Sequence, residues 1–362
     1  MSLKPSLNWL LVFVPITLLL DHLHAAAPLV FFSAALSIVP IAGGIVRSTE
    51  QIALRTGDAV GGLLNATFGN APELIIMTVA LRAGFPEMVI ASLVGAVLVN
   101  LLLGLGMAFL LGGLKYHEQT YNAGALTIYG TMMMMAVLSL AIPSAFSQVE
   151  IGRDLLRQKN ALNLGVAAYL LVAYGLYLVF MLKTHPDTFR SAESPSHESE
   201  RRRWSLPRAA GGLLVASVLA GWMSEILVGA AEETGEALGM SSVFIGIVFL
   251  AIVGGAAEGG SAIAMARKNK MDLAIGIAFG SCIQVALFVA PMLVLASLFL
   301  APEPLMLSFG RAQMAALLMA VALGVMVSGG GRSNWYKGVQ LVTMYLIIAS
   351  LFYFLPAATP GP

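Results

Sequence analysis

Two glutamates, Glu73 and Glu258, interrupt long apolar runs and share one register along the chain. A shift of 185 residues places Glu73 on Glu258, and an arginine, Arg82 or Arg267, follows each glutamate after nine residues. A charged group in the middle of a membrane helix costs on the order of 2.5–3.5 kcal/mol on insertion scales, so its usual interpretation is functional. The alternative is a structural carboxylate that stays protonated, and the equivalent positions of the two glutamates argue against it.

The residues around Glu73 add oxygen atoms and a break in the helix. Pro72 has no backbone N–H, so the carbonyl group of Phe68 loses its helical partner and becomes available to a cation or water. Gly69 lets the backbone bend, and Asn70, three residues before Glu73, offers an amide oxygen on the same helical face. The first copy is therefore expected to supply one carboxylate and several neutral oxygens.

The second copy surrounds its glutamate with glycine. Four glycines are expected to loosen the helix around Glu258 and to expose backbone carbonyls: Gly254, Gly255, Gly259 and Gly260. Ser281 and Gln284, from the next apolar run, add further oxygen ligands. No Cys or His is close in sequence to either glutamate, and hard oxygen ligands of this kind suit Ca²⁺ better than a soft metal.

Two buried carboxylates predict exchange rather than simple binding. The pair holds one divalent cation or two protons with similar net charge, whereas an empty unprotonated site would bury two like charges together. Movement of the cation is then coupled to movement of protons in the opposite direction. A second group of acidic residues lies near the ends of two other apolar runs, where a solvated helix end is the simpler interpretation and an ion-access path the functional one: Glu50, Glu225, Glu232, Glu233 and Glu236.

Composition defines the class of protein. Of the 362 residues, 58% are hydrophobic and 11% are charged, against about a quarter charged in soluble proteins, so an integral membrane protein is expected. The net charge of +1 provides no basic patch for nucleic acid, and the one cysteine, Cys282, excludes an internal disulfide. No H-E-x-x-H or G-x-S-x-G motif occurs, so neither an enzyme nor a bound cofactor is expected. A channel would differ from an exchanger by keeping its conductance after loss of the Glu73 carboxylate.

Eleven apolar runs approach the roughly 20 residues that a membrane-spanning helix needs. They are residues 7–23, 28–46, 60–81, 89–114, 125–146, 161–182, 207–231, 241–266, 273–300, 313–330 and 336–355. Of the 20 lysines and arginines, five fall on the side opposite the N-terminus: Arg82, Arg153, Arg157, Lys159 and Arg311. That asymmetry predicts a multi-pass protein with a cytoplasmic N-terminus. Glu73 and Glu258 lie in the third and eighth runs, so the odd offset makes the copies antiparallel, an inverted repeat with its site near the midplane.

A polar segment divides the chain into halves. Residues 183–206 are rich in Ser, Pro and charge and predict a cytoplasmic linker. The predicted organisation is an extra N-terminal helix over 1–24, one five-helix repeat over 25–182 and a second over 207–362. Membrane lipid is the expected surroundings, and the sequence leaves the oligomeric state open, a homo-oligomer included.

Several stretches resemble the Ca²⁺/H⁺ antiporter family of the cation/calcium exchanger superfamily. They are STEQIALRTGDAVGGLLNATFGNAPELI, LVNLLLGLGMAFLLGGLKY and RKNKMDLAIGIAFGSCIQVALFVAP, with a weaker match at SNWYKG. The resemblance implies an all-α membrane fold with eleven helices and two inverted repeats, Ca²⁺ and H⁺ as substrates, and Glu73 and Glu258 as central ligands. It also implies paired sliding helices, which the repeat offset assigns to the second and seventh apolar runs.

Several positions depart from the family pattern. The second repeat has Gly255 and Gly259 where relatives resemble GNAAEH, and the first has Ala96 and Val99 where they usually carry Ser. More of the coordination is then left to water and backbone carbonyls, which keeps open a Na⁺-coupled Ca²⁺ exchanger or another cation/H⁺ exchanger on the same fold. The linker also lacks the strongly acidic run of relatives. With no long regulatory tail, a prokaryotic plasma membrane is the expected location.

Overall fold

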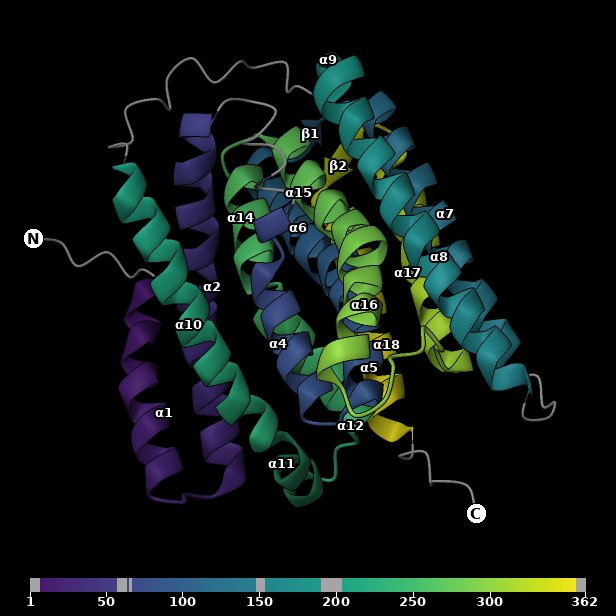
Figure 1. Ribbon diagram of the computed structural model, residues 1–362. Helices are drawn as coiled ribbons and strands as arrows, with labels where there is room; N and C mark the ends of the chain where they lie inside the picture. The colour runs from purple at the N-terminus through teal and green to yellow at the C-terminus, as the bar shows by residue number, and fades with distance from the viewer. Residues whose placement is uncertain (1–6, 57–63, 65–66, 148–153, 190–203, 356–362) are drawn as a thin grey trace, which may run out of the picture. The chain divides into compact units, whose positions relative to one another are not determined.

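The computed structural model describes residues 7–56, 64, 67–147, 154–189 and 204–355, and the fold is helical apart from two three-residue strands. It divides into two compact units (Figure 1). Unit 1 contains Met1–Ser92, Trp204–Ala257 and Ala349–Pro362, and unit 2 contains Leu93–Arg203 and Glu258–Ile348. Each unit takes residues from both halves of the sequence. The predicted all-helical fold is confirmed, and most of the linker, residues 190–203, lies outside the described residues.

Unit 1 is built around the pair α2 (Ala27–Thr56) and α10 (Leu206–Gly229). The end of α2 is tied to the start of α10, since Arg55 Nε donates to the Trp204 carbonyl oxygen over 2.8 Å and Trp204 N donates to Gln51 Oε1 over 2.9 Å. The two helices therefore run antiparallel. The other elements of unit 1 are η1 (Leu7–Val12), α1 (Phe13–His22), α4 (Ala71–Arg82), α5 (Pro86–Leu98) as far as Ser92, α11 (Ala231–Leu238), α12 (Ser242–Phe244), η4 (Ile245–Leu250) and α13 (Ala251–Gly254).

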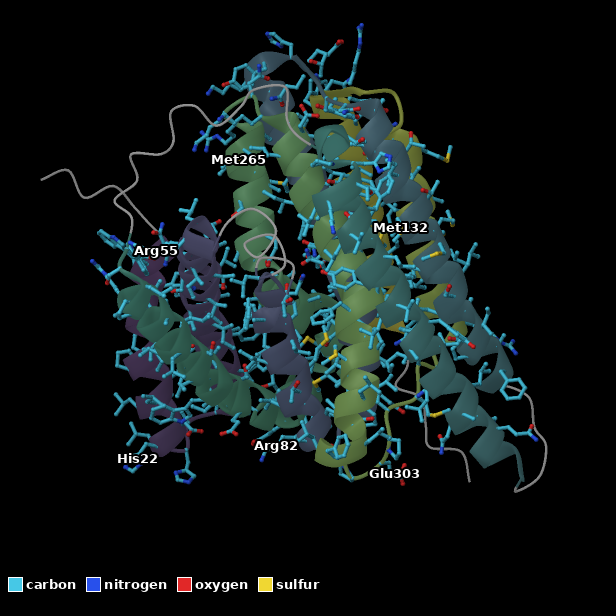
Figure 2. The ribbon with its side chains drawn as sticks, turned by 45° about the horizontal axis from the view of Figure 1, so that its top comes forward. His22, Arg55, Arg82, Met132, Met265 and Glu303 are labelled. Atoms are coloured by element: carbon cyan, nitrogen blue, oxygen red, sulfur yellow. The ribbon has the colours of Figure 1, made fainter. Side chains whose placement is uncertain are left out.

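The charged ends of the unit 1 helices follow from this antiparallel arrangement. Arg55, at the end of α2, lies at one end of the unit, whereas His22 and Arg82, at the ends of α1 and α4, lie at the other (Figure 2). The sequence analysis placed Arg55 and Arg82 on opposite sides of the membrane in the same way. Which side is cytoplasmic stays a prediction.

Unit 2 contains the remaining helices and a small β-ribbon. In the ribbon, β1 (Glu118–Thr120) pairs antiparallel with β2 (Arg332–Asn334). The helical elements are η2 (Val99–Gly104), α6 (Leu105–Tyr116), α7 (Ala123–Ser147), α8 (Asp154–Val179), η3 (Phe180–Thr184), α9 (Pro186–Phe189), α14 (Ala256–Ala266, shared with unit 1 at its first two residues), α15 (Met271–Gln284), η5 (Val285–Val289), α16 (Ala290–Leu300), α17 (Arg311–Ser328) and most of α18 (Trp335–Phe354).

The lengths of the apolar helices confirm an integral membrane protein. Among the described residues, eight helices are long and apolar enough to cross a membrane, or nine if the bent pair Ser242–Gly254 and Ala256–Ala266 forms one span. The first predicted run is a shorter apolar helix, Asn8–His22. The third, residues 60–81, lies partly outside the described residues. The count of eleven therefore stays a prediction.

The spans differ in how much of their apolar window is buried by the rest of the protein. In the span Pro86–Tyr116, 94% of the apolar window is buried, whereas only 33% is buried in Gln158–Thr184. On α8, Tyr169, Val172 and Leu176 share one helical face and are exposed, Tyr169 by 77%. An exposed apolar stripe of this kind suits contact with lipid hydrocarbon.

The inverted repeat is visible in matching local structure. The turns after α4 and α14 carry a left-handed residue at equivalent positions, Gly84 with φ 84° and Asn269 with φ 62°. Each turn is closed by a backbone hydrogen bond of 3.0 Å between equivalent positions, from Phe85 N to Ala80 O and from Lys270 N to Met265 O. The two copies thus end these helices in the same way, with the Schellman type of cap.

Equivalent residues of the two copies also meet within unit 2. Cys282 Sγ lies 3.8 Å from the carbonyl oxygen of Val97, which is 185 residues earlier. Residues related by a two-fold pseudo-symmetry contact each other only close to its axis, so that axis passes near Val97 and Cys282. Past this crossing both copies continue as π-helical turns, η2 and η5. The side chain of Cys282 at this crossing is fully buried.

Glycines allow α6 and α18 to pack with their backbones close together. A Cβ atom at Gly338 would overlap the backbone nitrogen of Leu110, and one at Gly106 would lie 2.9 Å from Val342 Cγ2. Small residues at such crossings are typical of membrane helices, where close packing replaces the hydrophobic effect.

We expect Gly338→Ala to destabilise the protein by roughly 1–3 kcal/mol, because the added methyl group has no room against α6. The measurement is the midpoint of thermal unfolding of the purified protein in detergent. Gly165→Ala on α8 is the matched control, since no atom of the described residues lies within 4 Å of its added Cβ. Equal midpoints for the two variants would contradict the close packing of α6 and α18.

Candidate cation site

Glu73 lies in the first turn of a half-helix. The chain turns at Gly69 and Asn70, and α4 begins at Ala71, with Pro72 in its first turn, where the missing N–H costs no hydrogen bond. Glu73 is the third residue of α4 and is 2% exposed. The break that the sequence predicted is confirmed. Its consequence is that the carboxylate sits at the positive end of a helix dipole, which stabilises an anion.

The carboxylate of Glu73 is buried without side-chain compensation. Within the described part of the chain, neither of its oxygens has a hydrogen-bond partner in another residue. Asn70, immediately before α4, is also buried, and its side chain does not cap the helix. The two carboxylate oxygens of Glu73 are therefore left for a ligand that would supply positive charge or protons.

Gly254 provides space for Glu73 within unit 1. A Cβ atom built on Gly254 would lie 2.8 Å from Glu73 Cγ and 3.5 Å from its Cδ. Any side chain at this position would therefore push Glu73 aside. The neighbouring Gly255 donates its N–H to the Ala251 carbonyl oxygen over 2.9 Å and ends α13. Both glycines were predicted to offer backbone carbonyls to the cation. Gly254 has a second role that the sequence did not indicate, which is to leave space for the Glu73 side chain.

Glu258 has the same local position in the second copy. The chain breaks at Gly255, the helices on either side are bent by 56°, and Glu258 is the third residue of α14. Both carboxylate oxygens are shielded from solvent. Among the described residues, no atom lies within 4 Å of a Cβ built on Gly259, the glycine that follows Glu258. The described part of the chain therefore does not fill the place of the side chain that relatives carry at 259.

A buried polar pair connects α15 to the other copy in unit 2. Asn100 Nδ2 donates to Ser281 Oγ over 3.0 Å, and both residues are buried. Gln284, at the end of α15, is half-buried. The sequence analysis named Ser281 and Gln284 but missed Asn100, although a lone amide in the apolar run LVNLLLG was a signal of the same kind as the glutamates.

The structure brings part of the predicted site together. Unit 1 holds Glu73 against Gly254, and unit 2 holds Ser281 against Asn100. Glu73 and Glu258 belong to different units, so their joint coordination of one ion stays a prediction. The acidic residues proposed to guide ion access are all exposed: Glu50, Glu225, Glu232, Glu233 and Glu236.

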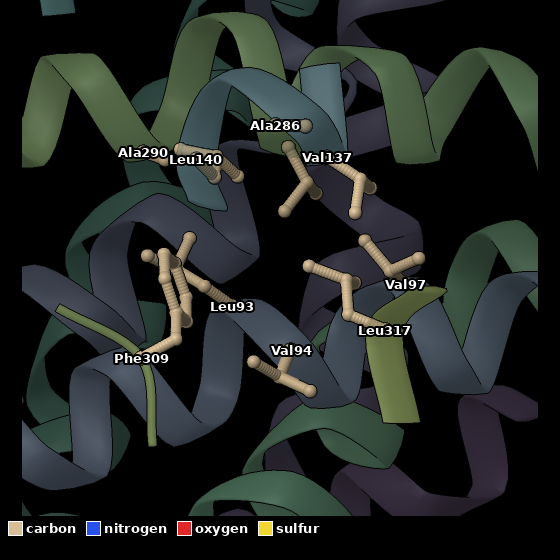
Figure 3. A pocket seen from close by; sticks show the side chains of 10 residues that line it. Leu93, Val94, Val97, Val137, Leu140, Ala286, Ala290, Phe309 and Leu317 are labelled. Atoms are coloured by element: carbon tan, nitrogen blue, oxygen red, sulfur yellow. The ribbon is translucent and has the colours of Figure 1, made fainter. Parts of the chain in front are cut away.

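A separate pocket in unit 2 is apolar and offers no oxygen ligand from a side chain. It is lined by residues of four helices, of η5 and of the segment before α17 (Figure 3): Leu93, Val94, Val97, Val137, Leu140, Val285, Ala286, Ala290, Phe309 and Leu317. A cavity of this kind does not coordinate a cation. The candidate ligands therefore remain the polar groups of α4, α14 and α15.

Known proteins share both the sequence and the fold. The family model described as sodium/calcium exchanger protein matches residues 26–183 and 208–354. The chain is 37% identical to the Ca(2+)/H(+) antiporter of Aphanothece halophytica, covering 96% of each chain, and 39% identical to the Ca(2+)/H(+) antiporter ChaA of Bacillus subtilis, covering 94% of this chain and 97% of that one. The solved structure of native YfkE has a TM-score of 0.83 at 36% identity and covers 97% of this chain and all of that one.

These matches extend over both copies of the repeat and include the segments that carry Glu73 and Glu258. The predicted resemblance is confirmed, and this chain belongs to the sodium/calcium exchanger protein family.

Proposed function

We propose that this protein exchanges Ca²⁺ for H⁺ across a membrane by alternating access, with Glu73 and Glu258 binding either the cation or protons. One observation carries the proposal. Each glutamate is the third residue of a half-helix, at equivalent positions of an inverted repeat. Relatives similar over nearly their whole length are called Ca(2+)/H(+) antiporters, which supports the choice of ions.

The ligand chemistry fits a hard divalent cation. Ca²⁺ takes six to eight oxygen ligands at about 2.3–2.6 Å, and two carboxylates balance its charge. Besides the glutamates, the proposed ligands are side-chain and backbone oxygens, completed by water: Asn70, Ser281 and Gln284, and the carbonyl groups of Gly69, Gly254 and Gly255. When the cation leaves, protons take over the charge balance, because two bare carboxylates buried together would repel each other.

Access to the site is proposed to change by sliding of the pair α2 and α10. These helices correspond to the second and seventh predicted spans and pack against each other in unit 1. Glu50 lies near the end of α2 and Glu225 near the end of α10, which are opposite ends of an antiparallel pair. Exposed carboxylates at both ends, with Glu236 on α11, would raise the local cation concentration on each side.

The proposed organisation follows the sequence halves. One extra helix over 1–24 precedes two five-helix repeats over 25–182 and 207–362, joined by a cytoplasmic linker. The two matched family segments support this division. We place the protein in a prokaryotic plasma membrane with a cytoplasmic N-terminus, surrounded by lipid and compatible with a homo-oligomer.

A Na⁺-coupled exchanger is the second candidate on this fold, and the open space at Gly259 favours considering it, because one expected side-chain ligand is missing. Proteoliposomes loaded with either a pH gradient or a Na⁺ gradient separate the two. We expect Ca²⁺ uptake to follow the pH gradient. Uptake that follows only the Na⁺ gradient would show that the protein exchanges Ca²⁺ for Na⁺ and not for H⁺.

We expect Glu73→Gln and Glu258→Gln each to reduce Ca²⁺ uptake driven by a pH gradient by at least about tenfold, because each removes one charged ligand and one proton carrier. Radiolabelled Ca²⁺ uptake into proteoliposomes is the measurement. Glu303→Gln, at an exposed position between α16 and α17, is the control and should retain uptake. Normal exchange by both site variants would contradict the assignment of Glu73 and Glu258 to the ion site.

We expect Gly254→Ala to reduce uptake while leaving the protein folded. The added methyl group would displace Glu73, yet alanine is a better helix former than glycine. Uptake and the thermal midpoint are measured on the same preparation. Gly175→Ala on α8 serves as the control, because the added Cβ has no atom of the described part of the chain within 4 Å. Uptake equal to that of the control would show that Glu73 does not depend on the space at Gly254.

A further inference from the structure

The C-terminal end of α14 is held by a side chain from a distant part of unit 2. Gln119 Nε2 donates to the carbonyl oxygen of Ala266 over 2.9 Å and to Asn269 Oδ1 over 2.8 Å. Gln119 is 2% exposed and its bond to Ala266 is buried, whereas Asn269 is exposed at the other end of the second bond. A buried amide that bridges a helix carbonyl and the side chain of the following turn fixes both groups in place.

The β-ribbon fixes Gln119 in turn. Gln119 is the central residue of β1 and pairs with Ser333 of β2. Its side chain passes over Gly112 of α6, where a Cβ atom would overlap the Gln119 amide oxygen. Backbone pairing on one side and a glycine slot on the other therefore leave Gln119 few alternative rotamers.

Two further donors reach the same end of α14. Lys115 Nζ and Tyr116 Oη, at the end of α6, donate to the carbonyl oxygen of Arg267 over 2.9 Å and 3.0 Å. A positive charge at a helix C-terminus is favourable because the free carbonyl groups carry partial negative charge. Lys115, Tyr116 and Gln119 together are called the α14 latch below.

The composition of α14 explains why an external hold is useful. The helix follows a break at Gly255 and contains Gly259 and Gly260, and a Cβ built on either of these last two meets no atom of a described residue within 4 Å. Glycine is the least favourable helix residue after proline, so this helix is weakly specified around Glu258. The equivalent helix α4 has no glycine.

The two copies differ at the residue that receives the latch. The left-handed position after α4 is Gly84, which adopts this conformation without strain, whereas the equivalent position after α14 is Asn269. Asn269 is the less favourable residue for the turn, but its amide oxygen accepts the bond from Gln119. The asparagine thus adds a connection that the first copy cannot make at Gly84.

We infer that Gln119, supported by Lys115 and Tyr116, is a positioning residue that holds the Glu258 half-helix for cation binding. The inference rests on the proposed function, because it assigns Glu258 to the ion site. Eight residues separate Glu258 from Ala266, about 12 Å of helix, so a shift of the held end is passed to the carboxylate. Ca²⁺ binds its oxygen ligands at about 2.3–2.6 Å, so a helix that holds the Glu258 carboxylate away from this distance binds the cation more weakly.

The test uses Gln119→Leu, which removes both bonds, and Asn269→Gly, which removes one bond while favouring the turn. We expect the Ca²⁺ concentration for half-maximal uptake to rise about tenfold in Gln119→Leu and by a smaller factor in Asn269→Gly, with maximal rates nearly unchanged. Hydrogen exchange by mass spectrometry should show faster exchange of the amides of α14 in both variants.

Gln313→Leu is the matched control, since Gln313 is another buried glutamine of unit 2, which accepts a bond from Gly310 N at the start of α17. It should lower stability without changing half-saturation or exchange in α14. If Gln119→Leu folds and reaches half-maximal uptake at the wild-type Ca²⁺ concentration, the positioning role is overturned. If Gln119→Leu fails to fold, a wild-type half-maximal concentration in Asn269→Gly overturns it instead. If wild-type protein moves no Ca²⁺, the proposed function fails, and hydrogen exchange in α14 alone decides whether the latch holds the helix.

Discussion

Burying a carboxylate among apolar membrane helices is the constraint on which the rest of this structure depends. A continuous helix has no free N–H group in its middle, so it offers such a charge no compensation. The chain breaks at Gly69–Asn70 and at Gly255 instead, and each glutamate occupies the first turn of the helix that follows. The helix dipole and the exposed N–H groups then favour the negative charge. The remaining imbalance is what a cation or protons would remove.

The inverted repeat satisfies this constraint twice, with different local means. Matching turns close α4 and α14, and the copies cross at Val97 and Cys282. Around that crossing the symmetry is broken by a polar pair, Asn100 and Ser281, whose equivalents are Val285 and Ala96. One of the two equivalent residue pairs at the crossing is therefore polar, and the other is apolar. A site built this way presents different ligands to a cation from each copy.

Two glycines near Glu258 have different surroundings in the structure: Gly254, which keeps the pattern GNAAEH, and Gly259, which departs from it. Gly254 is required where it stands, because Glu73 packs on its backbone. At Gly259 no described residue lies within 4 Å of an added Cβ, so the described part of the chain sets no steric limit there. The two glycines look alike in the sequence, and only their surroundings separate a steric requirement from an open position.

Features whose residue pattern lies within a short stretch of the chain were predictable from the sequence. The membrane class, the paired glutamates, the repeat and the helix breaks were predicted because charge, proline and glycine inside apolar runs leave a local pattern. The linker falls mostly, and the third span partly, on residues outside the described part, so the eleven-helix count and these boundaries stay predictions. Asn100 was overlooked although its signal was present in the sequence.

The sequence by itself determined which residues carry charge into the apolar runs and that the two copies share one register, because both features follow from order along the chain. Only the tertiary structure decided what touches those residues. The bond from Asn100 to Ser281 joins residues 181 apart, and that from Gln119 to Ala266 joins residues 147 apart. Contacts over such separations depend on how helices pack, and a one-dimensional pattern of residue types does not contain that information.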